Sequence, residues 1–262
     1  MNYAAERTEN LLVGRPQSVP RISPILLSLF DQYTRRYFAR HFSSLFVTHP
    51  LPCFDRAAGP YVVFLNHASW WDPLVCLLLA RHFTSAFSNF APIDRLMLDK
   101  FRFFRRLGFF GIEKNSRVGA IQFLRTSRAI LAQPDSALWI TPQGEFVNQR
   151  VRPIELKSGI GLLAHSVPNL QLVPLALDYS FGSDRLPTVC AKFGSMISTA
   201  DARFLSRDGW AELLRLALEQ TLDELQVDVL SSDSKHRTHI VAGQRGTGGI
   251  YGLCQRLRGA QC

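Results

Sequence analysis

The stretch of sequence that decides the fold is Tyr61-Val62-Val63-Phe64-Leu65-Asn66-His67-Ala68-Ser69-Trp70-Trp71-Asp72-Pro73. Its first five residues are apolar and favour β-structure, and a second apolar run begins after Pro73. This pattern predicts a buried strand over 61–65, a loop that carries His67, and a helix over 72–83. The carboxylate of Asp72 would hold one nitrogen of His67 protonated. The other nitrogen could then take a proton from a hydroxyl, which is the minimum requirement for general-base catalysis.

The same stretch allows a purely structural interpretation. An Asp followed by Pro is a favourable helix start, so the carboxylate of Asp72 could do no more than cap the helix. A single His at the end of a strand is often a hydrogen-bonded structural residue. The stretch by itself leaves the catalytic and structural interpretations of His67 open.

Length and composition set the class of protein and the kind of partner. A chain of 262 residues that is 47% hydrophobic is expected to form one α/β domain with appendages. Its net charge of +9 calls for an anionic partner: nucleic acid, an anionic membrane, or a phosphorylated or CoA-type substrate. The basic residues alternate with Phe and Leu and form no lysine-rich block, which favours a membrane surface over nucleic acid.

The cysteines and the apolar runs indicate where the protein works. The five cysteines form no CxxC pair, which indicates neither a disulfide framework nor a zinc site and favours the reducing cytoplasm. The first residues lack the apolar core of a signal peptide, and the apolar runs are too short to span a bilayer. We therefore expect a cytoplasmic protein that lies peripherally on the inner face of the membrane.

Strand and helix patterns alternate along the chain. Strands are predicted at 61–65, 85–91, 109–113, 137–141, 170–178 and 188–193. Helices are predicted at 72–83, 92–107, 117–132, 154–167 and 210–230. The alternation indicates an α/β fold with a mixed central sheet flanked by helices and preceded by an N-terminal amphipathic helical segment. In such sheets the site gathers at the carboxyl ends of the strands, where His67 and residues 142–144 are expected to meet.

The chain divides into four predicted parts. They are a flexible N-terminus over 1–20, an amphipathic membrane-associating helical segment over 21–50, the main domain over 51–230, and a disordered basic tail over 231–262. A helix from Arg21 to about Val47 could place its apolar face in lipid or pack on the domain, and both possibilities stay open. The aromatic helix over 92–107 is a second candidate for a lipid or acyl-chain surface.

Asn66-His67-x-x-x-x-Asp72 resembles the NHxxxxD signature of the glycerolipid acyltransferases, of the bacterial 1-acylglycerol-3-phosphate acyltransferase type. The resemblance spans about residues 60–195. It implies an O-acyltransferase that moves a fatty acyl group from acyl-CoA or acyl carrier protein to a hydroxyl of a lipid acceptor. His67 would be the base, Asp72 would orient it, and Asn66 would contact substrate. The resemblance implies no metal and no tightly bound cofactor.

Later blocks match the family in part. Gly108 to Asn115 resembles the second motif, in which Glu113-Lys114 replaces an acid-arginine pair, so Lys114 is a predicted substrate contact. Residues 141–146, Thr-Pro-Gln-Gly-Glu-Phe, resemble the third motif FPEGTR, with Gln143 in place of Glu and Phe146 in place of Arg. The predicted substrate-binding residues of this region are Gln143, Gly144, Glu145, Arg150, Arg152 and Lys157.

The altered third motif bears on the identity of the acceptor. Without its arginine the motif lacks its best phosphate ligand, so either Arg150 or Arg152 reaches back or the acceptor is not a phosphomonoester. The default acceptor is a lysophospholipid such as 1-acylglycerol 3-phosphate, and the alternatives are a glycolipid or a hydroxylated isoprenoid. A hypothesis of another class is a catalytically idle membrane-binding protein of the same fold. The intact His67 and Asp72 oppose it, and the altered third motif favours it.

Overall fold

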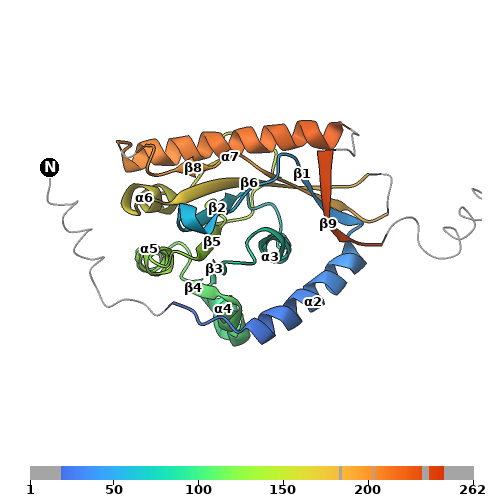
Figure 1. Cartoon of the computed structure of the whole chain (residues 1–262), viewed down its shortest axis with the longest axis horizontal. Helices are drawn as coiled ribbons and strands as arrows, with labels where there is room; N and C mark the ends of the chain where they lie inside the picture. The colour runs from blue at the N-terminus through green and yellow to red at the C-terminus, as the bar shows by residue number, and fades with distance from the viewer. Residues whose placement is uncertain (1–18, 183–184, 203, 232–235, 245–262) are drawn as a thin grey trace, which may run out of the picture.

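The computed structural model describes residues 19–182, 185–202, 204–231 and 236–244. Within them the chain forms a nine-stranded mixed sheet in the order β4-β3-β5-β2-β6-β7-β1-β9, with β8 beside β6 (Figure 1). The strands are β1 (Ser44–Thr48), β2 (Tyr61–Leu65), β3 (Ser88–Asp94), β4 (Phe109–Ile112), β5 (Ser136–Ile140), β6 (Gln171–Ser180), β7 (Thr188–Phe193), β8 (Ile197–Ser198) and β9 (Arg237–Ala242). The helices are α2 (Pro24–His41), α3 (Asp72–Phe83), α4 (Arg95–Lys100), α5 (Arg117–Leu131), α6 (Gly159–Ser166) and α7 (Arg207–Leu230), with 3₁₀ turns η1 (Arg56–Ala58) and η2 (Arg102–Leu107).

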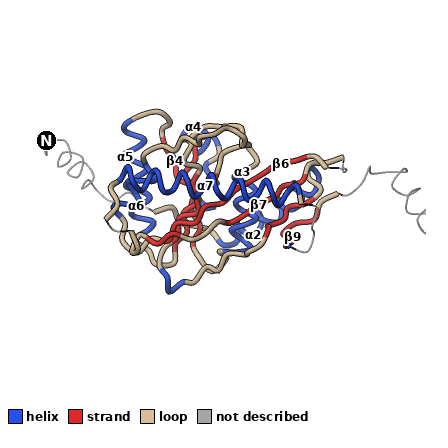
Figure 2. Tube along the Cα trace, turned by 90° about the horizontal axis from the view of Figure 1, so that it is seen from above, coloured by secondary structure: helices blue, strands red, loops and turns tan. Residues whose placement is uncertain are grey.

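Helices cover both faces of the sheet, which confirms the predicted fold class. Strand β2 lies between β5 and β6, parallel to both, and all five of its positions are buried. A strand buried on both faces reads as a continuous apolar run, which explains why 61–65 could be predicted with these bounds. Viewed from above, α7 lies along the length of the sheet (Figure 2).

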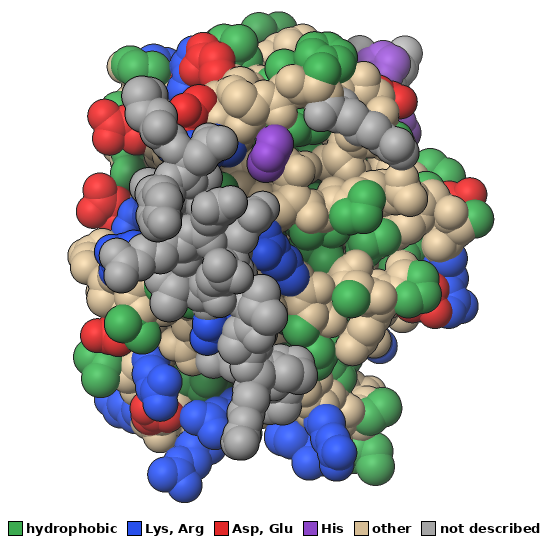
Figure 3. Space-filling model, turned by 90° about the vertical axis from the view of Figure 1, so that its left-hand side faces the viewer, with side chains coloured by type: hydrophobic (Ala, Val, Ile, Leu, Met, Phe, Trp, Pro, Cys, Tyr) green, Lys and Arg blue, Asp and Glu red, His purple; other side chains and the backbone are tan. Residues whose placement is uncertain are grey.

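The end of the molecule formed by α2, α4 and η2 combines apolar and basic side chains. Figure 3 shows Lys and Arg side chains at the lower part of the face that lies on the left of Figure 1, with hydrophobic side chains among them. The backbone N–H of Ser23 donates to the carbonyl oxygen of Arg106 at 2.8 Å, and the ring of Phe30 lies 5.9 Å from that of Phe103. Helix α2 and the η2 turn therefore form one continuous surface.

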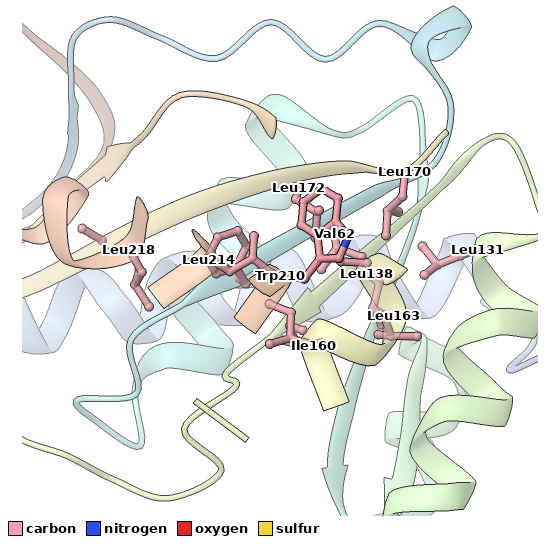
Figure 4. Packing of buried hydrophobic residues seen from close by; sticks show 14 of the residues in the cluster. Val62, Leu131, Leu138, Ile160, Leu163, Leu170, Leu172, Trp210, Leu214 and Leu218 are labelled. Carbon is pink, nitrogen blue, oxygen red and sulfur yellow. The ribbon is translucent and has the colours of Figure 1, made fainter. Parts of the chain in front are cut away.

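Alternating residues of β2 divide the core into two halves. Val62 packs against Trp210 and Leu214 of α7 and Ile160 of α6 (Figure 4). Val63 belongs to the opposite half, together with residues of α3 and with Phe38 of α2. Because a register slip would exchange these two sets, the apolar pattern also fixes the position of the loop that follows β2.

The start of α3 excludes one interpretation of Asp72. Asp72 is the first residue of the helix, and the capping position is Trp71, which makes no side-chain capping bond. The interpretation in which the Asp72 carboxylate only caps α3 is therefore wrong. The predicted bounds of this helix and of strand 188–193 are confirmed.

The helix predicted over 92–107 does not begin at Pro92, so its predicted start is wrong. Pro92 lies inside β3, at a position where the described sheet pairs β3 with β4 alone. A residue without an N–H fits such a one-sided position. The helix begins instead after Asp94, whose side chain accepts the N–H of Leu96, and it divides after Lys100 into α4 and η2.

The predicted division into parts is wrong at both ends of the main domain. The first helix ends at His41, and Ser44–Thr48, predicted to belong to the helical segment, form β1 in the main sheet. β1 pairs with β7 and with β9, and β9 lies within the predicted disordered tail. The main domain therefore extends beyond 51–230 on both sides. The predictions for residues 1–18 and 245–262 lie outside the described residues.

The helix predicted over 154–167 begins only at Gly159. The preceding residues belong to a loop in which the N–H of Lys157 donates to the carbonyl oxygen of Pro142 at 2.8 Å. This bond ties the segment before α6 to the segment after β5. No helix of the described residues is long and apolar enough to cross a membrane.

Candidate active site

His67 and Asp72 form a hydrogen-bonded pair after the carboxyl end of β2. Nδ1 of His67 lies 2.7 Å from Oδ2 of Asp72, and the Asp72 side chain is only 1% exposed. A carboxylate can only accept here, so Nδ1 carries the proton and Nε2 is left as a base. The same Oδ2 accepts the backbone N–H of Ser69 at 3.1 Å. The pair predicted from the sequence is therefore brought together.

Tyr179 completes the arrangement and was missed by the sequence analysis. Its hydroxyl donates to Oδ1 of Asp72 at 2.6 Å. Burial, and then the charge of Asp72, raises the pKa of Tyr179 well above its ordinary value, so the hydroxyl remains a donor. β6 pairs its Leu175 with Leu65, the last residue of β2, and then continues to Ser180. The sequence signal for this contact was the length of the apolar run in β6, because the residues after Leu175 lie beside the loop that follows β2.

Side chains of neighbouring strand ends hold the loop of residues 66–71, which carries His67. Oε1 of Gln143 accepts the backbone N–H of His67 at 2.7 Å, and the N–H of Val147 donates to the carbonyl oxygen of His67 at 2.8 Å. The buried Asn66 side chain accepts from the N–H of Leu177 at 2.8 Å and donates to its carbonyl oxygen at 3.0 Å. Asn66 and Gln143 were predicted to contact substrate, and in the structure both side chains hold this loop in position.

Phe146, at the position of the family's arginine, lies against the imidazole. The centroids of the Phe146 and His67 rings are 4.3 Å apart, and Phe146 is 60% exposed. Gly144 adopts φ +73°, and a Cβ on it would come within 2.6 Å of Cε of Lys157. The N–H of Gly144 donates to the carbonyl oxygen of Thr141, so this predicted substrate contact is used in the turn. The imidazole therefore meets an aromatic ring where the motif would supply a cation.

The remaining predicted contacts differ in their partners. Nζ of Lys114 lies 3.5 Å from Oδ2 of Asp94, and Nζ of Lys157 donates to Oδ1 of Asn115 at 3.1 Å. Glu145 is exposed. These three positions lie at the surface, where none of them touches the His67–Asp72 pair.

Arg150 and Arg152, either of which could replace the arginine absent from the third motif, have different surroundings. Arg152 donates to Oδ1 of Asp223 on α7 at 2.7 Å and to the carbonyl oxygen of Gln149 at 2.9 Å. Arg150 lines a groove of about 340 Å³ that adjoins the loop of His67. The other residues of this groove are Phe42, Ala68, Ser69, Trp71, Asn148, Gln149, Tyr179, Phe181 and Pro187.

A second groove lies on α7. A groove of about 520 Å³ is lined only by residues of α7, among them Glu219, Asp223 and Glu224, and none of its residues belongs to the loop of His67. Among the residues that the structure describes, no group of three His, Cys, Asp or Glu side chains is placed to hold a metal ion.

A family model and a solved structure match this chain. The family model described as acyltransferase matches residues 47–178, half of the chain. The chain is similar in structure to the crystal structure of the 1-acyl-sn-glycerophosphate acyltransferase PlsC from Thermotoga maritima. The TM-score is 0.54 at 15% sequence identity, over 80% of this chain and 82% of that one, which is a likeness of fold. No curated protein matches the sequence.

Proposed function

The chain belongs to the acyltransferase family, and we propose that it is a lysophospholipid-type O-acyltransferase. It takes a fatty acyl group from a thioester donor, acyl-CoA or acyl carrier protein, and joins it to a hydroxyl of a lipid acceptor. The default acceptor is a lysophospholipid such as 1-acylglycerol 3-phosphate. The reaction as proposed uses side chains alone, without a metal or a tightly bound cofactor.

His67 acts as the general base. The acceptor hydroxyl attacks the carbonyl carbon of the thioester while its proton passes to Nε2 of His67. The carbon–sulfur bond then breaks, and the imidazolium returns the proton to the leaving thiolate. Asp72, 2.7 Å from Nδ1, stabilises the imidazolium while it exists. Tyr179 and the N–H of Ser69 hold the carboxylate in place.

The observation that carries the proposal is the environment of Asp72. A buried carboxylate is costly unless it is paired, and this one has hydrogen bonds from a backbone N–H, a tyrosine hydroxyl and an imidazole. A His that served only the fold would not require a buried negative charge beneath it. The intact arrangement therefore favours an enzyme over the idle membrane-binding hypothesis.

Phe146 supports a second class of acceptor, one without a phosphate. An exposed aromatic ring against His67 offers apolar contact area beside the reacting hydroxyl and no charge. A glycolipid or a hydroxylated isoprenoid would suit such a ring. Comparing neutral with phosphorylated acceptors separates these alternatives.

We also propose that the protein works on the inner face of the cytoplasmic membrane. Ile25, Leu29 and Tyr33 are exposed and follow each other at helical i, i+4 spacing on α2. Leu96 and Phe103 are exposed on the neighbouring α4 and η2. The exposed basic side chains beside them are Arg21, Arg36, Arg95, Lys100, Arg102, Arg105 and Arg106. An apolar face flanked by arginines suits an anionic bilayer surface.

The test is His67→Ala, followed by mass spectrometry of the lipids that acyl-CoA and 1-acylglycerol 3-phosphate yield. Loss of the diacylated product, with an unchanged melting temperature and unchanged vesicle binding, is the expected result. Because the His67 side chain is only 16% exposed, the melting temperature must be measured in parallel. Equal product from both proteins would overturn the role of His67, and no product from either would favour the idle fold.

A further inference from the structure

We propose that the groove behind the catalytic loop binds the phosphomonoester of the acceptor, and that Arg150 is the residue that recognises it. This inference rests on the proposed acyl transfer. It assigns the charged group of the acceptor to a place that the altered third motif does not indicate. The chemistry recognised is a phosphate monoester attached to an acyl chain.

The groove is shaped for a molecule with one charged and one apolar part. Phe42, Trp71 and Phe181 supply aromatic walls, and Arg150 supplies the cation. Its volume of about 340 Å³ lies within the range of small-ligand sites. A ligand there would lie directly against the segment that presents His67, because Ser69, whose backbone N–H bonds Asp72, also lines the groove.

Arg150 is the cation that is left available. The guanidinium of Arg150 has no hydrogen bond or salt bridge to another described residue, whereas Arg152 is bonded to Asp223 and to backbone carbonyls. Lys114 and Lys157 have their own oxygen partners, on Asp94 and Asn115. A planar guanidinium can bind phosphate through two parallel hydrogen bonds, which makes Arg150 the better ligand as well as the free one.

Asp178 does not neutralise Arg150 by contact. Asp178 is buried and receives its hydrogen bond from the amide of Gln149, and its other oxygen is buried without a hydrogen-bond partner. Arg150 acts on Asp178 only through its charge. The guanidinium therefore keeps its donors for a ligand in the groove.

Phe146 explains why the phosphate has to bind elsewhere. Its ring lies against that of His67 at a centroid distance of 4.3 Å, and it stands at the sequence position where the family's motif has an arginine. A phosphate set there would lose its hydration against an aromatic ring without gaining a cation. The groove supplies the cation on a segment only a few residues further along the chain.

The test compares Arg150→Gln with Arg152→Gln in the full chain. The control is matched in chemistry, because both changes remove a guanidinium from the same loop. The bonds that Arg152 loses are those to Asp223 on α7 and to the backbone carbonyl oxygens of Gln149 and Val151. KM and kcat are measured at saturating acyl-CoA for 1-acylglycerol 3-phosphate and for its neutral counterpart, 1-acylglycerol. Arg150→Gln should raise KM for the phosphorylated acceptor about tenfold, as expected for one lost charge-assisted hydrogen bond. KM for the neutral acceptor should stay unchanged, and Arg152→Gln should leave the ratio of the two KM values as it is.

CoA also carries phosphate groups, which Arg150 could bind. A second experiment therefore varies the acyl donor. KM is measured for acyl-CoA and for an acyl-pantetheine thioester that lacks the nucleotide. A rise confined to KM for acyl-CoA would assign Arg150 to the donor and overturn the proposal. An equal effect of both arginine variants would also overturn it.

Failure of the acyl-transfer proposal is recognised separately. If the unmodified protein acylates neither acceptor, binding of monomeric 1-acylglycerol 3-phosphate is followed by tryptophan fluorescence, because Trp71 lines the groove. Weaker binding to Arg150→Gln, with unchanged binding to Arg152→Gln, would support the anion site without the activity. Equal binding to all three proteins would refute it.

Discussion

Replacing Asp72 by Asn removes the charge beneath His67 and leaves the hydrogen bonds in place. The N–H of Ser69 and the Nδ1–H of His67 both donate to Oδ2, so an oxygen of the new amide must face them. Its NH₂ group would then face Tyr179, whose hydroxyl can accept as well as donate. The ring therefore keeps its tautomer and orientation, and the substitution isolates the electrostatic contribution.

The size of that contribution follows from the burial of the pair. The bonded atoms lie 2.7 Å apart, and Asp72 is 1% exposed. Two delocalised charges with centres about 4 Å apart interact with about 4 kcal/mol at an effective dielectric constant of about 20. The interaction exists only once His67 is protonated, so its loss raises the barrier rather than weakening substrate binding. We expect kcat to fall by about 10³-fold with little change in KM.

Acyl transfer to 1-acylglycerol 3-phosphate is followed by mass spectrometry of the product, with far-UV circular dichroism and melting temperature as controls. His67→Ala sets the background rate. If the folded Asp72→Asn protein retains kcat within a factor of about ten of the unmodified enzyme, the charge does not stabilise an imidazolium, and the general-base mechanism is refuted.

Three further changes test other parts of the site and surface. Tyr179→Phe removes one of the hydrogen bonds of Asp72 and should lower kcat about tenfold. Steady-state kinetics should show a smaller loss in the Asp72→Asn background, and a shift in melting temperature alone would contradict a positioning role. Burial raises the pKa of Asp178, so its contribution to folding stability is complete below the unfolded value of 3.8 and is lost as pH rises through the folded value. Asp178→Asn should therefore raise the melting temperature at neutral pH, with a gain that shrinks as pH falls toward 3.8, and a gain independent of pH would disprove burial of the charge. Leu29→Glu, at a side chain 58% exposed, should weaken sedimentation with anionic vesicles about tenfold, whereas Leu216→Glu on α7, 50% exposed, should not. Equal effects of the two glutamates would argue against a membrane surface at α2.

The local parts of the structure could be predicted because neighbouring residues determine them. The bounds of β2 and α3 and the pairing of His67 with Asp72 follow from one apolar run, one loop and one helix start. The missed parts depend on residues far away in the sequence. β1 is a strand because β7 and β9 pair with it, and Pro92 is tolerated in β3 because β5 pairs only with the first part of that strand.

The same distinction applies to the candidate site. The motifs could identify Arg150 and Arg152 but could not choose between them, because the partner that occupies Arg152 lies on α7. Tyr179 could not be connected to Asp72 until the register of β2 and β6 was known. Gln143 and Asn66 look like ligand-binding residues in a motif, and only their hydrogen bonds to the His67 backbone and to Leu177 assign them to the fold.

The position of β1 has a consequence for how the chain is made. β1 lies between β7 and β9, and β9 is synthesised after every other strand of the described sheet. Until Ala242 has emerged, β1 presents an open row of backbone donors and acceptors on which another chain can add a strand. A chain truncated after residue 230 would lack β9 and would leave that edge open permanently. β9 therefore protects β1 from pairing with other chains as well as completing the described sheet.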